Sequence, residues 1–207
     1  MNGSVAILLA AAVVVLAVAV LAIVVLVRRR SATTPGGAAT AGKRPRDQAA
    51  GPLRGGPLGV TPGDRLEIRG LPYAVCGTIR LVEGDWSWAQ HLLDDGSGAR
   101  RWMSVEGGEE PELVLWAAEP GATVTPGAPT IDLAGRRYTW AESGQARYTA
   151  IGETGLPPTG TVRYHDYQAA GGARLSFEAY GEQGWGVARG DRLDPAEVTI
   201  RPRPAAG

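Results

Sequence analysis

Cysteine, histidine and phenylalanine are almost missing from this chain of 207 residues, which holds one Cys, two His and one Phe. A lone cysteine cannot form an internal disulfide framework, and so few cysteines and histidines exclude a Cys/His zinc finger. The hydrophobic fraction of 44% is too high for a wholly disordered chain. The sequence therefore indicates one folded domain with an appendage.

Charge is spread unevenly along the chain, although 21 basic and 21 acidic residues cancel. Residues 1–57 hold seven basic groups against one acidic group, whereas residues 58–207 hold 14 against 20, so the net charges are +6 and −6. This asymmetry is typical of a basic tether that carries an acidic domain. Because an acidic domain repels phosphate groups, we expect no nucleic-acid partner.

The longest apolar run, Val5–Val27, consists only of Ala, Val, Leu and Ile. As a helix it would span about 34 Å, enough for the ~30 Å hydrocarbon core of a bilayer. Residues 1–4 form a short tail before the run and Arg28–Arg30 follow it. The positive-inside rule then predicts a single-pass anchor in the cell membrane, with the N-terminus outside and the rest of the chain in the cytoplasm. A lone cysteine fits that reducing side.

Residues 28–57 form a basic linker rich in Gly, Pro and Ala, with too few apolar side chains to build a core. Its first three residues, Arg28, Arg29 and Arg30, either contact anionic lipid headgroups or only fix the topology and keep the linker soluble. The sequence leaves both roles open.

The remainder, residues 58–204, alternates short runs rich in Val, Ile, Thr, Tyr and Trp with Gly, Pro and Asp-Gly. This pattern predicts a mainly antiparallel β domain. The expected strands are Arg65–Arg69, Tyr73–Glu83, Trp86–Leu93, Arg101–Glu106, Leu113–Ala117, Thr130–Leu133, Arg137–Glu142, Gln145–Ile151, Thr161–Tyr167, Arg174–Ala179, Gly184–Arg189 and Glu197–Arg201.

An internal repeat relates the two halves of this domain. Leu66–Tyr73 is matched 65 positions later by Ile131–Tyr138, and Met103–Glu106 is matched 72 positions later by Leu175–Glu178. An insertion in Gly152–Gly160 accounts for the change of offset. The matches predict a duplicated unit.

The two units, about 63–119 and 129–203, are expected to pack face to face about a pseudo-twofold axis. A sandwich and two small fused barrels both satisfy the pattern. Strand alternation places Ser104 and Glu106 on one face, and Met103 and Val105 on the opposite face, which we expect to be the core.

The order of several motifs resembles a bacterial family, domain-of-unknown-function family 4178. The resemblance covers Gly63–Ile200 and implies an envelope-associated role, but it assigns no activity and no catalytic residue. The motifs that carry it are Gly63–Gly77, Trp86–Leu93, Arg101–Glu106, Tyr138–Ala146, Gly152-Glu153, Tyr164–Tyr167 and Leu175–Glu178.

Tryptophans and carboxylates in the domain suggest a ligand site. An aromatic cluster beside acids holds organic cations through cation–π and charge contacts, so a polyamine-like ligand is one hypothesis. The alternative is that the tryptophans only fill a β core. The candidate ligand residues are Trp86, Trp88, Trp102, Glu106 and Glu178, with Asp85, Asp94 and Asp95 as further acids.

Three functions remain open from the sequence. The first is a membrane-anchored cytoplasmic interaction module for an unknown protein partner, the second is the cation sensor, and the third is a hydrolase that pairs Glu106 with Glu178. No nucleophile elbow or phosphate-binding loop is present, so we assign no catalytic residue, metal or cofactor. Cys76 is expected to be a small buried hydrophobe, and His91 and His165 to be half-buried side chains.

Overall fold

The computed structural model describes residues 59–107 and 111–201. These residues belong to the second of the two units into which the chain divides, Ala49–Gly207. The predicted anchor Val5–Val27 and the linker before residue 58 lie outside the described residues. Within the described ranges, no helix is long and apolar enough to cross a membrane.

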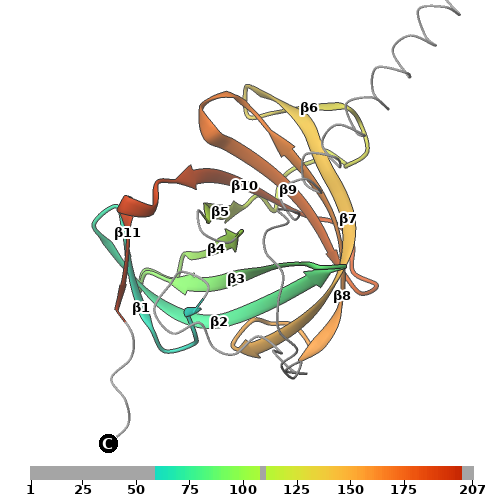
Figure 1. The fold of residues 1–207 in the computed structure, drawn as a ribbon. Coiled ribbons are helices and arrows are strands. Elements are labelled where there is room, and N and C mark those ends of the chain that lie inside the picture. The colour runs from blue at the N-terminus through green and yellow to red at the C-terminus, as the bar shows by residue number, and fades with distance from the viewer. Residues whose placement is uncertain (1–58, 108–110, 202–207) are drawn as a thin grey trace, which may run out of the picture. The chain divides into compact units, whose positions relative to one another are not determined.

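One antiparallel sheet of 11 strands contains almost all of the regular structure in the described residues, which confirms the predicted class (Figure 1). The described residues also contain two short 3₁₀ turns, Ala170–Gly172 and Pro195–Glu197. The strands are β1 Arg65–Ile68, β2 Leu71–Glu83, β3 Trp86–Asp94, β4 Arg100–Glu106, β5 Glu112–Ala118, β6 Thr130–Leu133, β7 Arg136–Gly152, β8 Thr159–Gln168, β9 Ala173–Tyr180, β10 Gly186–Leu193 and β11 Val198–Arg201.

The sheet closes on itself. Its order is β11-β1-β2-β3-β4-β5-β10-β9-β8-β7-β6, and β2 also pairs with β7. Eight strands, β2 to β5 and β7 to β10, therefore form a ring, and β1, β6 and β11 extend it. A continuous closed sheet replaces the expected sandwich or pair of fused barrels.

Closure depends on the two longest strands, β2 and β7. Along one of its edges, each of them pairs first with one strand and then with another. β2 pairs with β1 over Leu71–Ala74 and with β7 over Gly77–Val82. A bulge between Val75 and Gly77 separates the two stretches, and β7 has an equivalent irregularity between Trp140 and Glu142. Because a bulge bends a strand and increases its twist, it turns the strand from one neighbour to the next. β7 is one continuous strand, so the prediction of separate strands at Arg137–Glu142 and Gln145–Ile151 was wrong.

Both halves contribute the same strand pattern. The order from β1 to β5 is mirrored by that from β6 to β10, and the halves meet at the β5–β10 and β2–β7 pairs. The two-residue turns Arg69-Gly70 and Ala134-Gly135 also match, with φ of 53° and 77° in the first and 50° and 74° in the second. Two positive φ values are what a tight hairpin turn requires. The matching strand order and turns agree with the predicted internal repeat.

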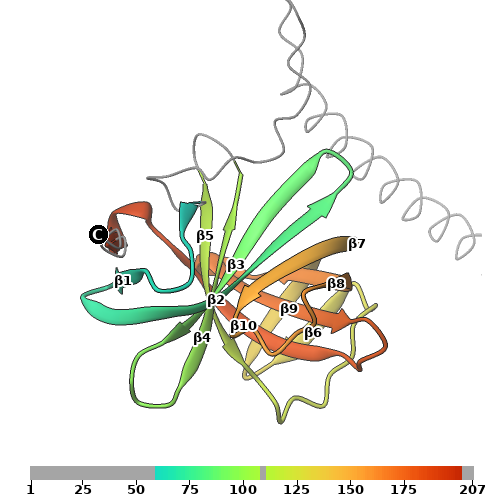
Figure 2. The ribbon, with the colours of Figure 1, turned by 90° about the horizontal axis from the view of Figure 1, so that it is seen from below.

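Separate apolar cores lie in the two halves, and Figure 2 shows the strands of each half gathered on its own side. The predicted core residues Met103, Val105, Leu175 and Phe177 are each 0% exposed. A third cluster, which includes Ile79, Leu81, Ala146, Tyr148 and Val162, lies where β2 and β7 close the ring.

Candidate functional site

The ring has an inner face whose side chains meet across its interior. β3 and β9 are separated by three strands in either direction around the ring, yet Gln90 Nε2 on β3 donates a hydrogen bond of 2.6 Å to Glu178 Oε1 on β9. Residues paired directly across neighbouring strands share a face. Gln90 pairs with Ser104, and Glu178 pairs with Tyr164, so these four residues belong to the inner face.

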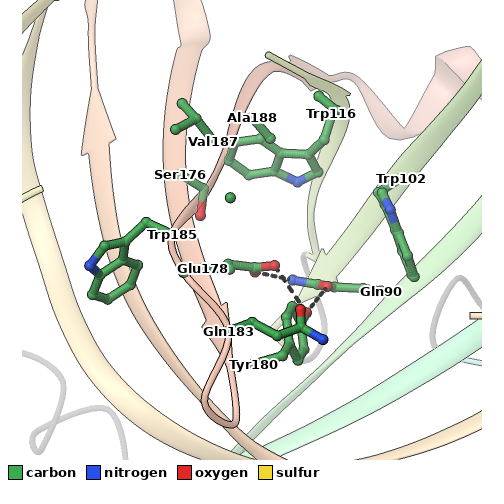
Figure 3. A pocket seen from close by; sticks show the side chains of 13 residues that line it. Gln90, Trp102, Trp116, Ser176, Glu178, Tyr180, Gln183, Trp185, Val187 and Ala188 are labelled. Carbon is green, nitrogen blue, oxygen red and sulfur yellow. Dashed lines mark hydrogen bonds between the residues drawn. The ribbon is translucent and has the colours of Figure 1, made fainter. Parts of the chain in front are cut away.

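A cavity of about 520 Å³ lies on this face (Figure 3). Its walls come from both halves: β3, β4 and β5 from the first, and β9, β10 and the loop between them from the second. The side chains that define its chemistry are Gln90, Trp102, Trp116, Ser176, Glu178, Tyr180 and Trp185.

The three tryptophans of the cavity are held in place by neighbours. Trp102 and Trp116 are direct cross-strand partners, and the Trp116 indole donates a hydrogen bond of 2.9 Å to Ser104 Oγ. Trp185 lies edge to face with His165, with ring centroids 5.2 Å apart, and the Arg163 guanidinium lies 5.1 Å from its ring centre. These contacts fix the aromatic walls before any ligand enters.

Glu178, Tyr180 and Gln90 form a closed hydrogen-bond network. The Tyr180 hydroxyl lies 3.0 Å from Glu178 Oε2 and 3.1 Å from Gln90 Oε1, and Gln90 Nε2 bonds the other Glu178 oxygen. One hydroxyl proton cannot serve both acceptors, whereas a protonated Glu178 donates to Tyr180, which then donates to Gln90. Burial likewise raises the pKa of Glu178, which is the direction that favours this protonated form.

Asp166 on β8 is the second unusual carboxyl group on this face. Burial, and then the negative charges of Glu178, Glu142 and Glu106, raise its pKa to about 8, while a hydrogen bond with Ser176 works in the opposite direction. Its Oδ1 atom is buried and forms no hydrogen bond with any residue that the structure describes. Asp166 is therefore largely protonated at neutral pH.

A further acid, Glu83 on β2, accepts a hydrogen bond of 2.5 Å from the Tyr164 hydroxyl on β8. Burial and this bond raise the pKa of Tyr164, so its phenol stays protonated. Gly144 makes room for the pair, because a Cβ at this position would lie 2.5 Å from the Glu83 carboxylate and 2.7 Å from the phenol.

All five predicted ligand residues lie on the inner face, but only two of them line the cavity. Trp102 and Glu178 line the cavity, and Trp88 packs beside it, edge to face with Tyr164 at 5.8 Å. Trp86 is 45% exposed and donates a hydrogen bond of 2.8 Å to Glu106 at the edge of the ring. Glu106 and Glu178 thus bind different partners, and the structure does not join them as the pair that a hydrolase would use.

Other sequence expectations need correction. Asp95 lies between β3 and β4, where a turn at Asp95-Gly96 was expected, and its Oδ1 accepts hydrogen bonds from Ser97. His91 is fully buried instead of half-buried and bonds Thr78 at 3.0 Å. Cys76 is only partly buried, because it is the extra residue of the β2 bulge, and burial raises the pKa of its thiol. No group of metal-ligating side chains occurs in the described part of the chain.

Of the seven side chains that define the cavity, five were not among the predicted ligand residues: Gln90, Trp116, Ser176, Tyr180 and Trp185. Asp166, on the same face, was also missed. Alternation from Trp88 and Trp102 would have placed Gln90 on the inner face. Trp116 lies opposite Trp102 on the next strand, so the pairing of these two strands would have placed it on the inner face. The surroundings of Asp166 could not be assigned, because they depend on closure of the ring.

Comparison with known proteins adds a family without a known activity. Residues 61–195 match the model for "Domain of unknown function (DUF4178)". The chain is 34% identical over 156 residues to Uncharacterized protein Rv2597 of Mycobacterium tuberculosis and to Uncharacterized protein Mb2628 of Mycobacterium bovis, covering 72% of this chain and 75% of each relative. No solved structure matches. The chain therefore belongs to the DUF4178 family of bacterial proteins whose function is unknown.

Proposed function

We propose that the inner cavity binds a small organic cation, such as a quaternary ammonium compound or an alkylamine. The observation that carries this proposal is that Glu178 lines one cavity together with Trp102 and Trp116, inside a closed sheet. Aromatic faces attract ammonium groups by about 0.5–2 kcal/mol each, and more strongly where water is excluded. A nearby carboxylate supplies the countercharge.

The charges around the cavity favour a cation over an anion. Among the residues that line it, Glu178 is charged when deprotonated and none is basic. Arg174 on the same sheet face is bound to Glu112 at 2.9 Å, which neutralises it. An anion in the cavity would therefore meet the Glu178 carboxyl group, and no basic side chain lines the cavity to receive it.

Protonated acids do not prevent cation binding. For Asp166, with a pKa of about 8, release of the proton at pH 7 costs about 1.4 kcal/mol. Asp166 does not line the cavity but is hydrogen-bonded to Ser176, which does, so an ammonium group bound there would favour the deprotonated form of Asp166. The cation then replaces a proton, and the cavity changes from neutral to charge-paired.

We also propose that Val5–Val27 anchors the domain at the cytoplasmic side of the cell membrane, with Arg28–Arg30 beside the headgroups. The length and composition of this run support the proposal. The interaction hypothesis requires a protein partner. This partner would then recognise the ligand-bound form of the anchored domain. Protease added to intact cells should leave the domain undigested; its digestion would place the domain outside.

Isosteric ligand pairs test the binding proposal. The full chain in mild nonionic detergent would be titrated with choline and with dimethylbutanol, in which carbon replaces the ammonium nitrogen, while tryptophan fluorescence is followed. Cadaverine and its neutral diol analogue pentanediol form a second pair, and spermidine extends the series. We expect at least one cation to saturate below about 1 mM and its neutral isostere to fail. Equal response to both members of each pair, or no saturation by any cation, would overturn the proposal.

A further inference from the structure

A second cavity, of about 440 Å³, lies on the opposite face of the β5–β10 pair from the first. Leu115 and Asp191 are cross-strand partners on this outer face, and both line it. We call it the arginine cavity, since its lining includes Arg101, Arg136 and Arg189. The cavity lies where the two halves of the ring meet, and both contribute to its walls.

Two equivalent tyrosines line the arginine cavity. Tyr73 and Tyr138 occupy matching positions of the internal repeat, and their rings belong to the separate cores of the two halves. Tyr73 is 7% exposed and Tyr138 is 3% exposed, and both line the cavity. Neither hydroxyl forms a hydrogen bond with another residue of the described ranges. Each hydroxyl is therefore a donor available to a ligand in the cavity.

The guanidinium groups give the arginine cavity its charge. Arg101 and Arg136 form no ion pair within the described part of the chain, whereas Arg189 is bound to Glu119, with 2.6 Å between Nε and Oε1. The hydrogen bond with Glu119 raises the pKa of the Arg189 guanidinium, and the nearby Tyr138 adds a smaller effect in the same direction. Asp191 contributes the one carboxylate of the lining. With Arg189 neutralised by Glu119, the two other guanidinium groups against the Asp191 carboxylate still leave a positive cavity in a domain whose net charge is negative.

We propose that the arginine cavity binds a small oxyanion, a phosphate group or a carboxylate, held by the Tyr73 and Tyr138 hydroxyls and by the Arg101 and Arg136 guanidinium groups. Guanidinium groups present paired N–H donors that match the oxygens of phosphate and carboxylate. Each phenol adds one more donor at a fixed position, because its ring is held in a core. This site is independent of the cation cavity and uses none of its side chains.

Calorimetric titration of the full chain in mild nonionic detergent tests the site, with inorganic phosphate, glycerol phosphate and succinate as probes at constant ionic strength. The three arms separate free phosphate, a phosphate ester and a dicarboxylate. We expect at least one probe to saturate below about 1 mM. The double variant Tyr73→Phe with Tyr138→Phe should bind it about tenfold more weakly and still fold, because both rings and their packing are kept.

Two further variants complete the test. Arg101→Gln should weaken the same probe by at least about tenfold, whereas Tyr148→Phe, which removes a phenol on the inner face, should leave it unchanged. No saturable binding by any of the three probes would overturn the proposal. Unchanged affinity in the double phenylalanine variant would overturn it equally, and that variant remains decisive if Arg101→Gln fails to fold.

Discussion

Trp116 on β5 lies directly over Gly190 on β10, its cross-strand partner, so that a Cβ added to Gly190 would stand 2.6 Å from the indole ring. The glycine is buried, and its backbone does not have a positive φ. Its role is therefore to leave space for the indole at the wall of the cation cavity.

Gly190→Ala should push Trp116 into the cavity. Overpacking of this kind typically costs about 1–3 kcal/mol, and the displaced indole should weaken binding of the cation that saturates the wild type by about tenfold. Urea unfolding followed by tryptophan fluorescence gives the first quantity, and ligand titration gives the second. Gly121→Ala is the matched control, because a Cβ at Gly121 meets nothing within 4 Å. Equal unfolding midpoints in the two variants would contradict this role for Gly190.

Glu178→Gln should remove the negative charge of the cavity without changing the stability of the domain. A glutamine accepts from Gln90 and donates to Tyr180, as the protonated acid does, so the unfolding midpoint should stay within error of the wild type. Cation affinity should fall by at least about tenfold, since the countercharge is lost. Glu182→Gln, an equal charge change in the exposed β9–β10 loop, should leave affinity unchanged. A Glu178→Gln variant that binds as the wild type does would remove Glu178 from the site.

Asp166 should make the domain less stable as pH rises. The folded state holds its proton up to a pKa of about 8, whereas the ordinary value for the unfolded chain is 3.8. Between these two values the folded state binds the extra proton, so this group destabilises folding by up to about 1.4 kcal/mol per pH unit as pH increases. Asp166→Asn should remove this slope, equal the wild type below about pH 4 and exceed it in stability near pH 8. Parallel curves of unfolding free energy against pH would contradict the shift.

Cation binding should strengthen as pH rises through the same window. A cation favours the deprotonated carboxylates, so affinity should increase until pH exceeds the Asp166 pKa of about 8 and then level off. Calorimetry in two buffers of different ionisation enthalpy should show proton release on binding. Asp166→Asn should release fewer protons than the wild type. Equal proton release in both proteins would assign the coupling to another group.

The β6–β7 turn offers a test of backbone strain. Ala134 has a φ of 50°, a conformation that costs a residue with a Cβ about 1–2 kcal/mol, while asparagine tolerates it. Ala134→Asn should therefore stabilise the domain by about 0.5–1 kcal/mol, measured by urea unfolding. Ala196→Asn, at a position outside the positive-φ region, controls for the added amide. A destabilised Ala134→Asn variant would contradict the turn geometry.

Local pattern was enough to predict most strands but not their closure. β6 has the predicted bounds, and the offset between Leu66–Tyr73 and Ile131–Tyr138 anticipated two identical turns. The pairing of β2 with β7 joins segments about 70 residues apart, and no local alternation encodes such a contact. The single strand β7 was read as two, because Ser143-Gly144 resembles a turn in sequence.

The same limit applied to the site. The tryptophans and Glu178 were found because their residue types suggest cation binding. Asp166 was missed, because its role comes from burial and from acids on other strands. Which strand face becomes the inside of a ring is decided only when the ring closes.

A crystal structure of the full chain with bound choline, or with whichever cation of the series saturates, tests the central claim most directly. We predict the ammonium group inside the ring, within about 6 Å of the Trp102 or Trp116 ring centre and beside Glu178. Density for the cation on the outer surface, with an inner cavity that holds only water, would contradict the account.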